Sequence, residues 1–316
     1  MLNLFAIFAL NRLTLLAVCE MAQYTIRQME LLSGIRASTI RMWEKRYNIF
    51  SPQRTDTNIR RYDDNDLRFI INLSLLLKRG FRISRLANLT LEELSDLASK
   101  FVSDRRMGNI NLEPLITATI QYNESELLKQ INEWADKHGI EYTFENLVLP
   151  YLQRLGDLWQ TGAITTTHEH FASNVIRNLL SHLYRTCKQP EIGKTTPIIF
   201  FLPEGEFHEI GLLYFAYVAK NAGYKTIYLG QSTPIDDVIR CAKDLNCKMV
   251  FTSLSSFVSA DMDKAFEPMT KALPEVEIIA TGHAFTEKSG PSYLTYVSSA
   301  QDLMKIIAQI DPTIIK

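Results

Sequence analysis

Apolar residues recur with two different periods along the 316-residue chain, and the period changes close to residue 198. Before that point apolar positions return every three or four residues, which predicts amphipathic helices. After it, short apolar runs alternate with helical patterns, which is typical of a parallel, doubly wound α/β sheet. The polar stretch 188–197, with two prolines and a glycine, is predicted to be the linker between the two regions.

The segment 22–92 is predicted to form a winged helix-turn-helix. Gly34 separates a first helix, which Thr25 can cap, from a second helix that begins at Ser38 or Thr39. The further elements expected are a hairpin tip at 55–59 and a third helix over 63–80. A helix, a glycine turn and a second helix place that second helix in the major groove of DNA.

Residues 93–187 are predicted to form a small four-helix bundle, followed over 198–316 by a Rossmann-like domain. The expected helices of the bundle region are 91–101, 112–122, 125–138, 144–161 and 166–187. The expected strands are 198–202, 225–229, 249–252, 276–280 and 294–297, separated by helices over 210–222, 235–246, 261–273 and 300–310. The predicted fold class is therefore multidomain α and α/β, with a winged helix-turn-helix, a four-helix bundle and a parallel sheet.

Residues 1–21 are mostly apolar, but Asn11 and Arg12 interrupt the run and no positive charge precedes it. We therefore expect an extra N-terminal segment, from an upstream start codon or as a short helix, rather than a membrane span or a signal peptide. The four cysteines are scattered without a CxxC pair, which favours a reduced, cytoplasmic setting.

The net charge of −1, with 34 Lys and Arg against 35 Asp and Glu, argues against a uniformly basic nucleic-acid-binding surface. Residues 22–90, however, hold 13 Lys and Arg against six Asp and Glu, a surplus of seven positive charges that leaves −8 for the rest. The average therefore hides a basic N-terminal module joined to an acidic remainder, and the basic module is a candidate for binding DNA.

The basic module carries side chains suited to DNA on its second helix and its hairpin. Arginine suits phosphate because its planar fork is always charged. The candidates are Thr39, Arg41, Trp43, Arg46 and Tyr47 around the second helix, with Arg54, Arg60, Arg61 and Tyr62 around the hairpin. Two alternatives stay open: Trp43 can pack mainly against the hairpin, and Arg41 can pair with Glu44.

Polar and small residues collect at the carboxyl ends of the predicted strands. The residues that follow the first, third and fourth strands are Glu206, His208 and Gly211, then Ser253 and Ser255, then Thr281 and Gly282. Doubly wound sheets bind ligands at this edge. A histidine there can ligate a metal while a nearby carboxylate fixes its tautomer. Taken alone, a loop histidine is more often a surface or hydrogen-bonding residue.

The stretches TIRQMELLSGIRASTIRMWEKRY, PQRT and RRYDDNDL together resemble the MerR family of bacterial transcription regulators over about residues 23–92. The resemblance implies that the chain binds double-stranded operator DNA, with phosphate contacts from Tyr62, Arg41 and Trp43. That family dimerises through a long helix after the DNA-binding domain. Here residues 91–99 lead into the bundle instead, so the chain is expected to self-associate differently, as a dimer or tetramer.

The pattern Glu-x-His-x-x-Gly, followed by Ser-x-Ser and a glycine turn, resembles the cobalamin-binding Rossmann-like domain. That resemblance makes His208 the lower axial ligand of cobalt and implies that the serines and glycines line the channel for the nucleotide tail. Two positions depart from the pattern: Thr281 stands where a second glycine is common, and Ser255 where an apolar residue is usual.

Trp159 is followed, after nine intervening residues, by Glu169 and His170 at the start of the next bundle helix. On its own this pattern suits a core tryptophan and an acid that favours a helix N-terminus. Combined with the other motifs, it resembles the CarH-type adenosylcobalamin-dependent light-responsive repressors over nearly all of residues 23–310. The resemblance implies that Trp159, Glu169 and His170 cover the upper face of adenosylcobalamin or methylcobalamin. Gln160 departs from it, because those repressors have a histidine there that captures cobalt after photolysis.

We therefore predict a cytoplasmic transcription regulator, a repressor rather than an enzyme, whose oligomerisation and operator binding depend on cobalamin and on light. One alternative keeps the fold but works without cobalamin, through a protein partner or another ligand, as Gln160, Ser255 and Thr281 suggest. Another alternative is a corrinoid carrier for methyl-transfer enzymes, which the N-terminal DNA-binding module argues against. No association with a membrane is expected.

Overall fold

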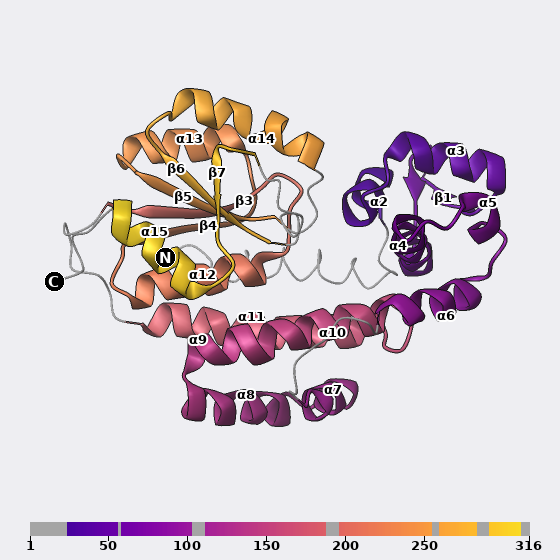
Figure 1. Cartoon of the computed structure of the whole chain (residues 1–316), viewed down its shortest axis with the longest axis horizontal. Helices are drawn as coiled ribbons and strands as arrows, with labels where there is room; N and C mark the ends of the chain where they lie inside the picture. Colours follow the sequence, from indigo (N-terminus) through magenta and orange to yellow (C-terminus); the bar gives the residue numbers. More distant parts are fainter. Residues whose placement is uncertain are drawn as a thin grey trace, which may run out of the picture. The chain divides into compact units, whose positions relative to one another are not determined.

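The computed structural model describes residues 24–55, 58–102, 111–187, 196–254, 259–282 and 291–310. The predicted extra segment 1–21, most of the linker 188–197, and Ser255 lie outside these described residues. The described chain divides into two compact units, one holding 24–102 with 157–166, and the other holding 111–156 with the residues from 167 onward. Figure 1 follows the elements of both units along the sequence.

The first unit contains a winged helix-turn-helix, as the sequence predicts. Its elements are α2 (Ile26–Ser33), α3 (Ala37–Tyr47), β1 (Gln53–Arg54), β2 (Arg60–Arg61), α4 (Asp64–Lys78), α5 (Ile83–Leu86) and α6 (Leu91–Val102). Thr25 and Gln28 form a capping box at the start of α2, and Gly34 ends that helix with a left-handed φ of 70°. Strands β1 and β2 pair antiparallel and form the wing, with Gln53 opposite Arg61.

The two helices α3 and α4 begin in different ways. Helix α3 begins at Ala37, which is earlier than Ser38 or Thr39, and no side chain caps its first turn. Helix α4 begins with a capping box in which Asp63 and Asp66 each accept the other's backbone N–H. The start of α3 therefore could not be read from a capping residue in the sequence, whereas the start of α4 could.

One apolar core holds α2, α3, α4 and the wing of the first unit together. Phe50 lies edge to face against Tyr62 and Phe69, at ring-centroid distances of 5.9 and 5.6 Å. Helix α6, predicted near the start of the bundle, contributes Leu94 and Ala98 to this same core. The buried residues shared by the other elements include Met29, Ile40, Trp43, Leu67, Ile70 and Leu73.

The second unit contains a five-stranded parallel sheet in the order β4-β3-β5-β6-β7. The strands are β3 (Ile198–Pro203), β4 (Thr226–Thr233), β5 (Met249–Ser253), β6 (Glu277–Thr281) and β7 (Leu294–Tyr296). The helices between and after them are α12 (Glu209–Asn221), α13 (Ile235–Asp244), α14 (Ser259–Ala272) and α15 (Ala300–Ile310). Helices α13 and α14 cover one face of the sheet, and α12 and α15 cover the other (Figure 1).

The strand order places a topological switch point at the carboxyl ends of β3 and β5. These two strands are neighbours although β4 lies between them in the sequence, so the chain leaves them toward opposite faces of the sheet. Such a switch point is where doubly wound sheets bind ligands. The loop that follows β3 brings the predicted residue His208 to this edge, and the last residue of β5 is the predicted residue Ser253.

The helices that precede the sheet form the helical cap of the second unit. They are α7 (Glu113–Ile120), α8 (Glu124–His138), α9 (Ile140–Thr143), the π-helical turn η1 (Phe144–Val148), α10 (Leu149–Gln160) and α11 (Thr166–Thr186). The end of α10, from Asp157, and the first residue of α11 belong to the first unit. The predicted helix 144–161 therefore begins earlier, at Ile140, and contains a π-helical turn. In that turn the Glu145 carboxylate accepts a hydrogen bond from the Tyr214 hydroxyl at 3.0 Å. The Phe144 ring stacks on the Tyr214 ring, with 4.2 Å between the ring centroids. Within the described residues, no helix is both long enough and apolar enough to cross a membrane.

The carboxyl group of Asp66 should make the stability of the first unit depend on pH. Burial raises its pKa to about 6, with a further contribution from the charges of Asp63 and Glu44, whereas in the unfolded chain it is about 3.9. A carboxyl group with a raised folded-state pKa costs stability when ionised, so the unit should become more stable as pH falls from 7.5 to 5. The Asp66→Asn variant keeps a capping oxygen and should lose this contribution. Thermal unfolding of both proteins at the two pH values measures it, and an identical pH dependence in both would contradict the assignment.

Candidate functional site

A buried carboxylate and an exposed imidazole meet in the loop between β3 and α12. The Glu206 side chain is fully buried, and its Oε1 accepts the backbone N–H groups of Phe207 and His208, both at 3.0 Å. The same oxygen lies 2.6 Å from Nδ1 of His208. An ionised carboxylate only accepts hydrogen bonds, so Nδ1 carries the proton, and in the neutral ring Nε2 keeps the lone pair that a metal requires. The His208 side chain is 54% exposed.

Opposing influences act on the pKa of His208. Loss of water around the ring lowers the pKa, but the hydrogen bond and charge of Glu206, together with the charge of Glu169, raise it above its ordinary value. The electrostatic influence of Glu169 relates the start of α11 to the loop after β3, within the second unit. A carboxylate on one ring nitrogen also makes the other nitrogen a stronger donor to a metal.

Close approach of backbone segments shapes the sheet edge beside this loop. An ideal Cβ on Gly211 would lie 3.1 Å from Oγ of Ser253, the last residue of β5. Gly282 has a φ of 116°, and a Cβ there would lie 2.3 Å from the carbonyl oxygen of Leu254. Only glycine fits that position, because its dihedral angle and its surroundings both exclude a side chain. Ser253 is opposite Thr281 in the pairing of β5 with β6, and both are buried.

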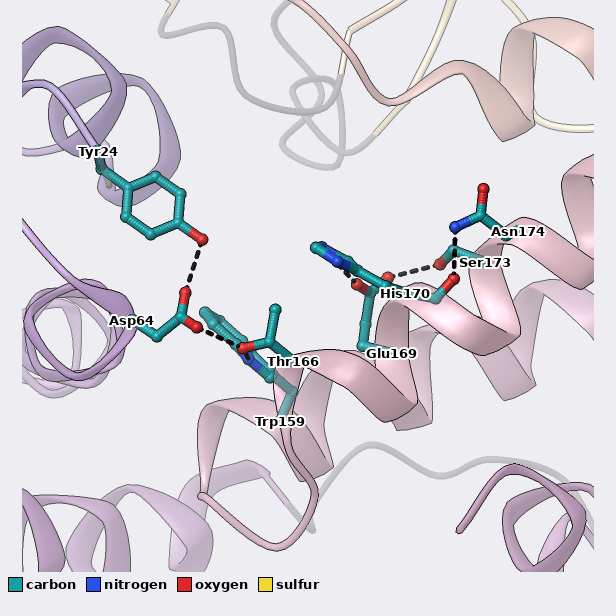
Figure 2. Close-up of polar contacts among 8 residues, drawn as sticks. All are labelled: Tyr24, Asp64, Trp159, Thr166, Glu169, His170, Ser173 and Asn174. Atoms are coloured by element: carbon teal, nitrogen blue, oxygen red, sulfur yellow. Dashed lines mark hydrogen bonds and ion pairs between the residues drawn. The ribbon is translucent and has the colours of Figure 1, made fainter. Parts of the chain in front are cut away.

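Two further predicted cofactor residues stand on the first turn of α11 in the second unit (Figure 2). Glu169 accepts the hydroxyl of Ser173 at 2.5 Å, and its other oxygen lies 3.7 Å from Nε2 of His170. The His170 side chain is 64% exposed, and that of Glu169 is 34% exposed. Both side chains are therefore accessible to a ligand.

Trp159, predicted to act with Glu169 and His170, belongs to the first unit. Its Nε1 donates to Oγ1 of Thr166 at 3.0 Å, and that hydroxyl donates to Asp64 at 2.8 Å (Figure 2). The other carboxylate oxygen of Asp64 accepts the hydroxyl of Tyr24 at 2.8 Å. The Arg68 guanidinium lies 5.5 Å from the centre of the Trp159 ring, in a cation–π contact. The Asp64 network consists of Tyr24, Asp64, Arg68, Trp159 and Thr166.

The segment 157–166 is attached to α4 at two further points. The buried Asn72 donates to the carbonyl oxygen of Gln160 at 3.0 Å, and Arg68 donates to that of Ile164 at 3.3 Å. Sequence reasoning missed Asp64 and Asn72, because their partners lie about a hundred positions away in the chain. The single available signal was a polar residue, Asn72, among the apolar positions of a predicted helix.

The predicted DNA-contacting residues differ in their accessibility. Trp43 is only 8% exposed and lies in the core, which agrees with the alternative that it mainly packs. The nine residues divide into Arg41, Arg46 and Arg54, which are exposed, Thr39, Tyr47, Arg60 and Arg61, which are half-buried, and Trp43 and Tyr62, which are buried. The exposed arginines come from both α3 and the wing, so both elements can reach phosphates.

Glu44 connects the wing to α3. Its carboxylate accepts Nε of Arg60 at 2.9 Å and also accepts the hydroxyl of Tyr62, whose side chain is fully buried. The alternative in which Glu44 pairs with Arg41 is therefore wrong, because the wing supplies two donors to the same carboxylate. Burial and the contact with Glu44 raise the pKa of Tyr62 well above its ordinary value. In this structure the Tyr62 hydroxyl is thus bound to Glu44.

Comparison with known families assigns each of these regions. Residues 24–93 match the MerR HTH family regulatory protein, and residues 112–184 and 198–289 each match a B12 binding domain. The chain joins a MerR helix-turn-helix domain to B12-binding domains. The three matched segments cover the winged helix-turn-helix, nearly all of the helical cap, and the parallel sheet from β3 to β6.

Known proteins with similar sequences include two repressors from Myxococcus xanthus. The HTH-type transcriptional repressor CarH is 27% identical over 258 residues, which are 79% of this chain and 85% of the relative. The HTH-type transcriptional repressor CarA is 23% identical over 211 residues, 66% and 68% of the two chains. Among solved structures, the monomethylamine corrinoid protein of Methanosarcina barkeri covers 62% of this chain and is itself covered to 96%, at 15% identity and a TM-score of 0.47. That likeness is too distant to bear on function.

Replacing Gly282 by alanine should destabilise the second unit by at least about 2 kcal/mol, because the new Cβ would clash with the Leu254 carbonyl at a strained dihedral angle. Gly156→Ala is the matched control, since Gly156 lies within α10 and a Cβ there meets no atom within 4 Å. That control should be neutral or more stable by up to about 1 kcal/mol. Urea unfolding measures both, and equal stabilities would contradict the predicted clash.

Replacing Glu44 by alanine should destabilise the first unit by about 1–3 kcal/mol, because the buried Tyr62 hydroxyl and Arg60 lose their acceptor. Glu44→Gln keeps an oxygen in place and should cost less. Adding Tyr62→Phe to Glu44→Ala removes the unpaired hydroxyl, so the double variant should lose less stability than the two single variants together. Additive losses in chemical unfolding would show that the hydroxyl is paired elsewhere.

Proposed function

We propose that the chain is a transcriptional repressor whose self-association and operator binding are controlled by adenosylcobalamin and by light. The observation that carries the proposal is the pair of a buried Glu206 and an exposed His208 at the ligand-binding edge of a doubly wound sheet. The matches to B12-binding domains support the cofactor class, and the names of the relatives CarH and CarA support repression.

The residues at the sheet edge fit a cobalamin held through its cobalt and its nucleotide tail. Nε2 of His208 would be the lower axial ligand, with Glu206 fixing the ring from the other side. The tail would lie along the edge formed by Ser253 and Thr281, where Gly211 and Gly282 let neighbouring parts of the chain pack closely. Bound adenosylcobalamin would supply a cobalt–carbon bond that light can break.

The Asp64 network supports coupling between the cofactor and the DNA-binding domain. Trp159 is expected to cover the upper face of the corrin with Glu169 and His170. Its indole N–H and its ring are, however, already engaged by Thr166 and Arg68. A role of Trp159 over the corrin would therefore compete with its contacts to α4, the helix that follows the wing. A bound corrin and helix α4 of the DNA-binding domain would thus compete for the Trp159 side chain.

The charge distribution supports control through self-association. The DNA-binding segment 22–90 carries seven surplus positive charges, and the rest of the chain carries −8. A single small basic domain on an acidic body should bind DNA weakly, whereas two or four linked domains bind with much higher effective affinity. A change of oligomeric state would then change how much of the operator is bound, without any change in α3, the helix expected to enter the major groove.

The proposal predicts that the full-length chain with adenosylcobalamin in the dark elutes as a larger species than without cofactor, and that it shifts operator DNA at lower protein concentration. Illumination should reverse both changes. Size-exclusion chromatography and band-shift assays on the same samples measure them. Unchanged elution and DNA affinity with and without cofactor would contradict cobalamin control and leave a MerR-type regulator that responds to another ligand or partner.

The cobalt ligand is tested by His208→Ala, which should abolish the absorption spectrum of histidine-ligated cobalamin and weaken binding at least about tenfold. His182→Ala is the matched control, because His182 is an exposed histidine of α11 outside the predicted site. Glu206→Gln should weaken binding less than His208→Ala does, since the ring remains but is held less firmly. An unaltered spectrum of the His208 variant would refute the assignment.

A further inference from the structure

The outward face of α3 is defined by the residues that point away from the core. Ile40 and Trp43 are buried, whereas Ser38, Met42 and Lys45 are exposed. The last three follow one another at spacings of four and three residues, so they form one ridge on the helix. In a helix-turn-helix the second helix enters the major groove. This ridge is therefore the part of α3 that would lie deepest against the bases.

Met42 is the apolar member of this ridge. Its exposed fraction is 49%, and the other large apolar side chain exposed among the described residues of the first unit is Ile59, at 50%. Ile59 precedes β2 of the wing, which is the second element expected to touch DNA. Both exposed apolar side chains thus lie on or beside the two elements expected to contact DNA, where a complex would remove them from water.

The charged neighbours of Met42 suit the walls of the groove rather than its floor. Arg41 lies to one side of the ridge and Arg46 to the other, and both are exposed. The Arg46 guanidinium lies 5.3 Å from the centre of the Tyr47 ring, which holds it to its own side of the helix. Flanking arginines contact phosphates and fix the register of the helix, but phosphates carry no sequence information. The ridge between them would face the base edges, which carry the sequence information.

We propose that Met42 selects an A·T base pair in each half-site by packing on the 5-methyl group of thymine. A thioether side chain is apolar and flexible, and it donates no hydrogen bond. The apolar feature that the major groove presents is the thymine methyl group, whereas the other edges offer donors and acceptors. A cytosine or guanine beneath Met42 would instead lose water without gaining a partner. The inference rests on the DNA-binding part of the proposed function and not on cobalamin control.

The experiment removes only the methyl group. A preferred duplex is selected from a random pool by the full-length chain, and each of its thymines is then replaced by uracil, which pairs identically. At one symmetry-related pair of positions the replacement should weaken binding about fourfold per half-site, as expected for one buried methyl group. In the Met42→Ala variant the same replacement should have little effect, because its partner is gone. Met42→Leu should preserve the preference for thymine.

The controls separate this inference from folding and from the wider proposal. Ile120→Ala changes an apolar side chain of equal exposure, 48%, on α7 in the other unit, and it should leave DNA affinity unchanged. Circular dichroism confirms that each variant is folded. A Met42→Ala variant that keeps full affinity, or that retains sensitivity to uracil at every position, overturns the contact with thymine. A selection that enriches no sequence overturns this inference and operator binding together.

Discussion

A carboxylate that is taken out of water must be given hydrogen-bond donors, and this constraint organises each functional region of the protein. Glu206 is fully buried and receives two backbone N–H groups and the ring of His208. Glu44 is nearly buried and receives Arg60 and Tyr62 from the wing. Asp64, half-buried, receives the hydroxyls of Tyr24 and Thr166. In each case the donors come from the element that the carboxylate must hold in place.

The three carboxylates act at different levels of the structure. Glu206 fixes one ring orientation within a single loop, so it sets local chemistry. Glu44 connects α3 to the wing, so it sets the geometry of two elements that would contact the same DNA. Asp64 joins α4 to residues of the segment 157–166, so it relates positions about a hundred residues apart. Removing one partner from such a group costs more than the contact contributes, because the remaining charge or dipole stays desolvated.

The location of Trp159 gives the regulatory proposal its physical content. If a bound corrin also engages Trp159, as proposed, the side chain would have two alternative sets of contacts, and a ligand shifts such an equilibrium only by its differential affinity for the two states. The cation–π contact and the hydrogen bond to Thr166 define one of those states. Both are modest interactions, so the proposed contact with a corrin would have little stabilisation to overcome.

The sequence by itself determined the elements and most of the sheet-edge site. Periodicity located the helices and the five strands, and the two-residue spacing of Glu206 and His208 already placed a carboxylate beside an imidazole, because both follow one strand. Local hydrogen bonds and alternation act over a few residues, and a single sequence records them directly. Only the tertiary structure decided that Glu44 binds the wing rather than Arg41, that Trp159 joins the first unit, and that Met42 is exposed at the centre of the outward face of α3. Those outcomes depend on which distant groups the packed core brings together, and sequence spacing does not encode that choice.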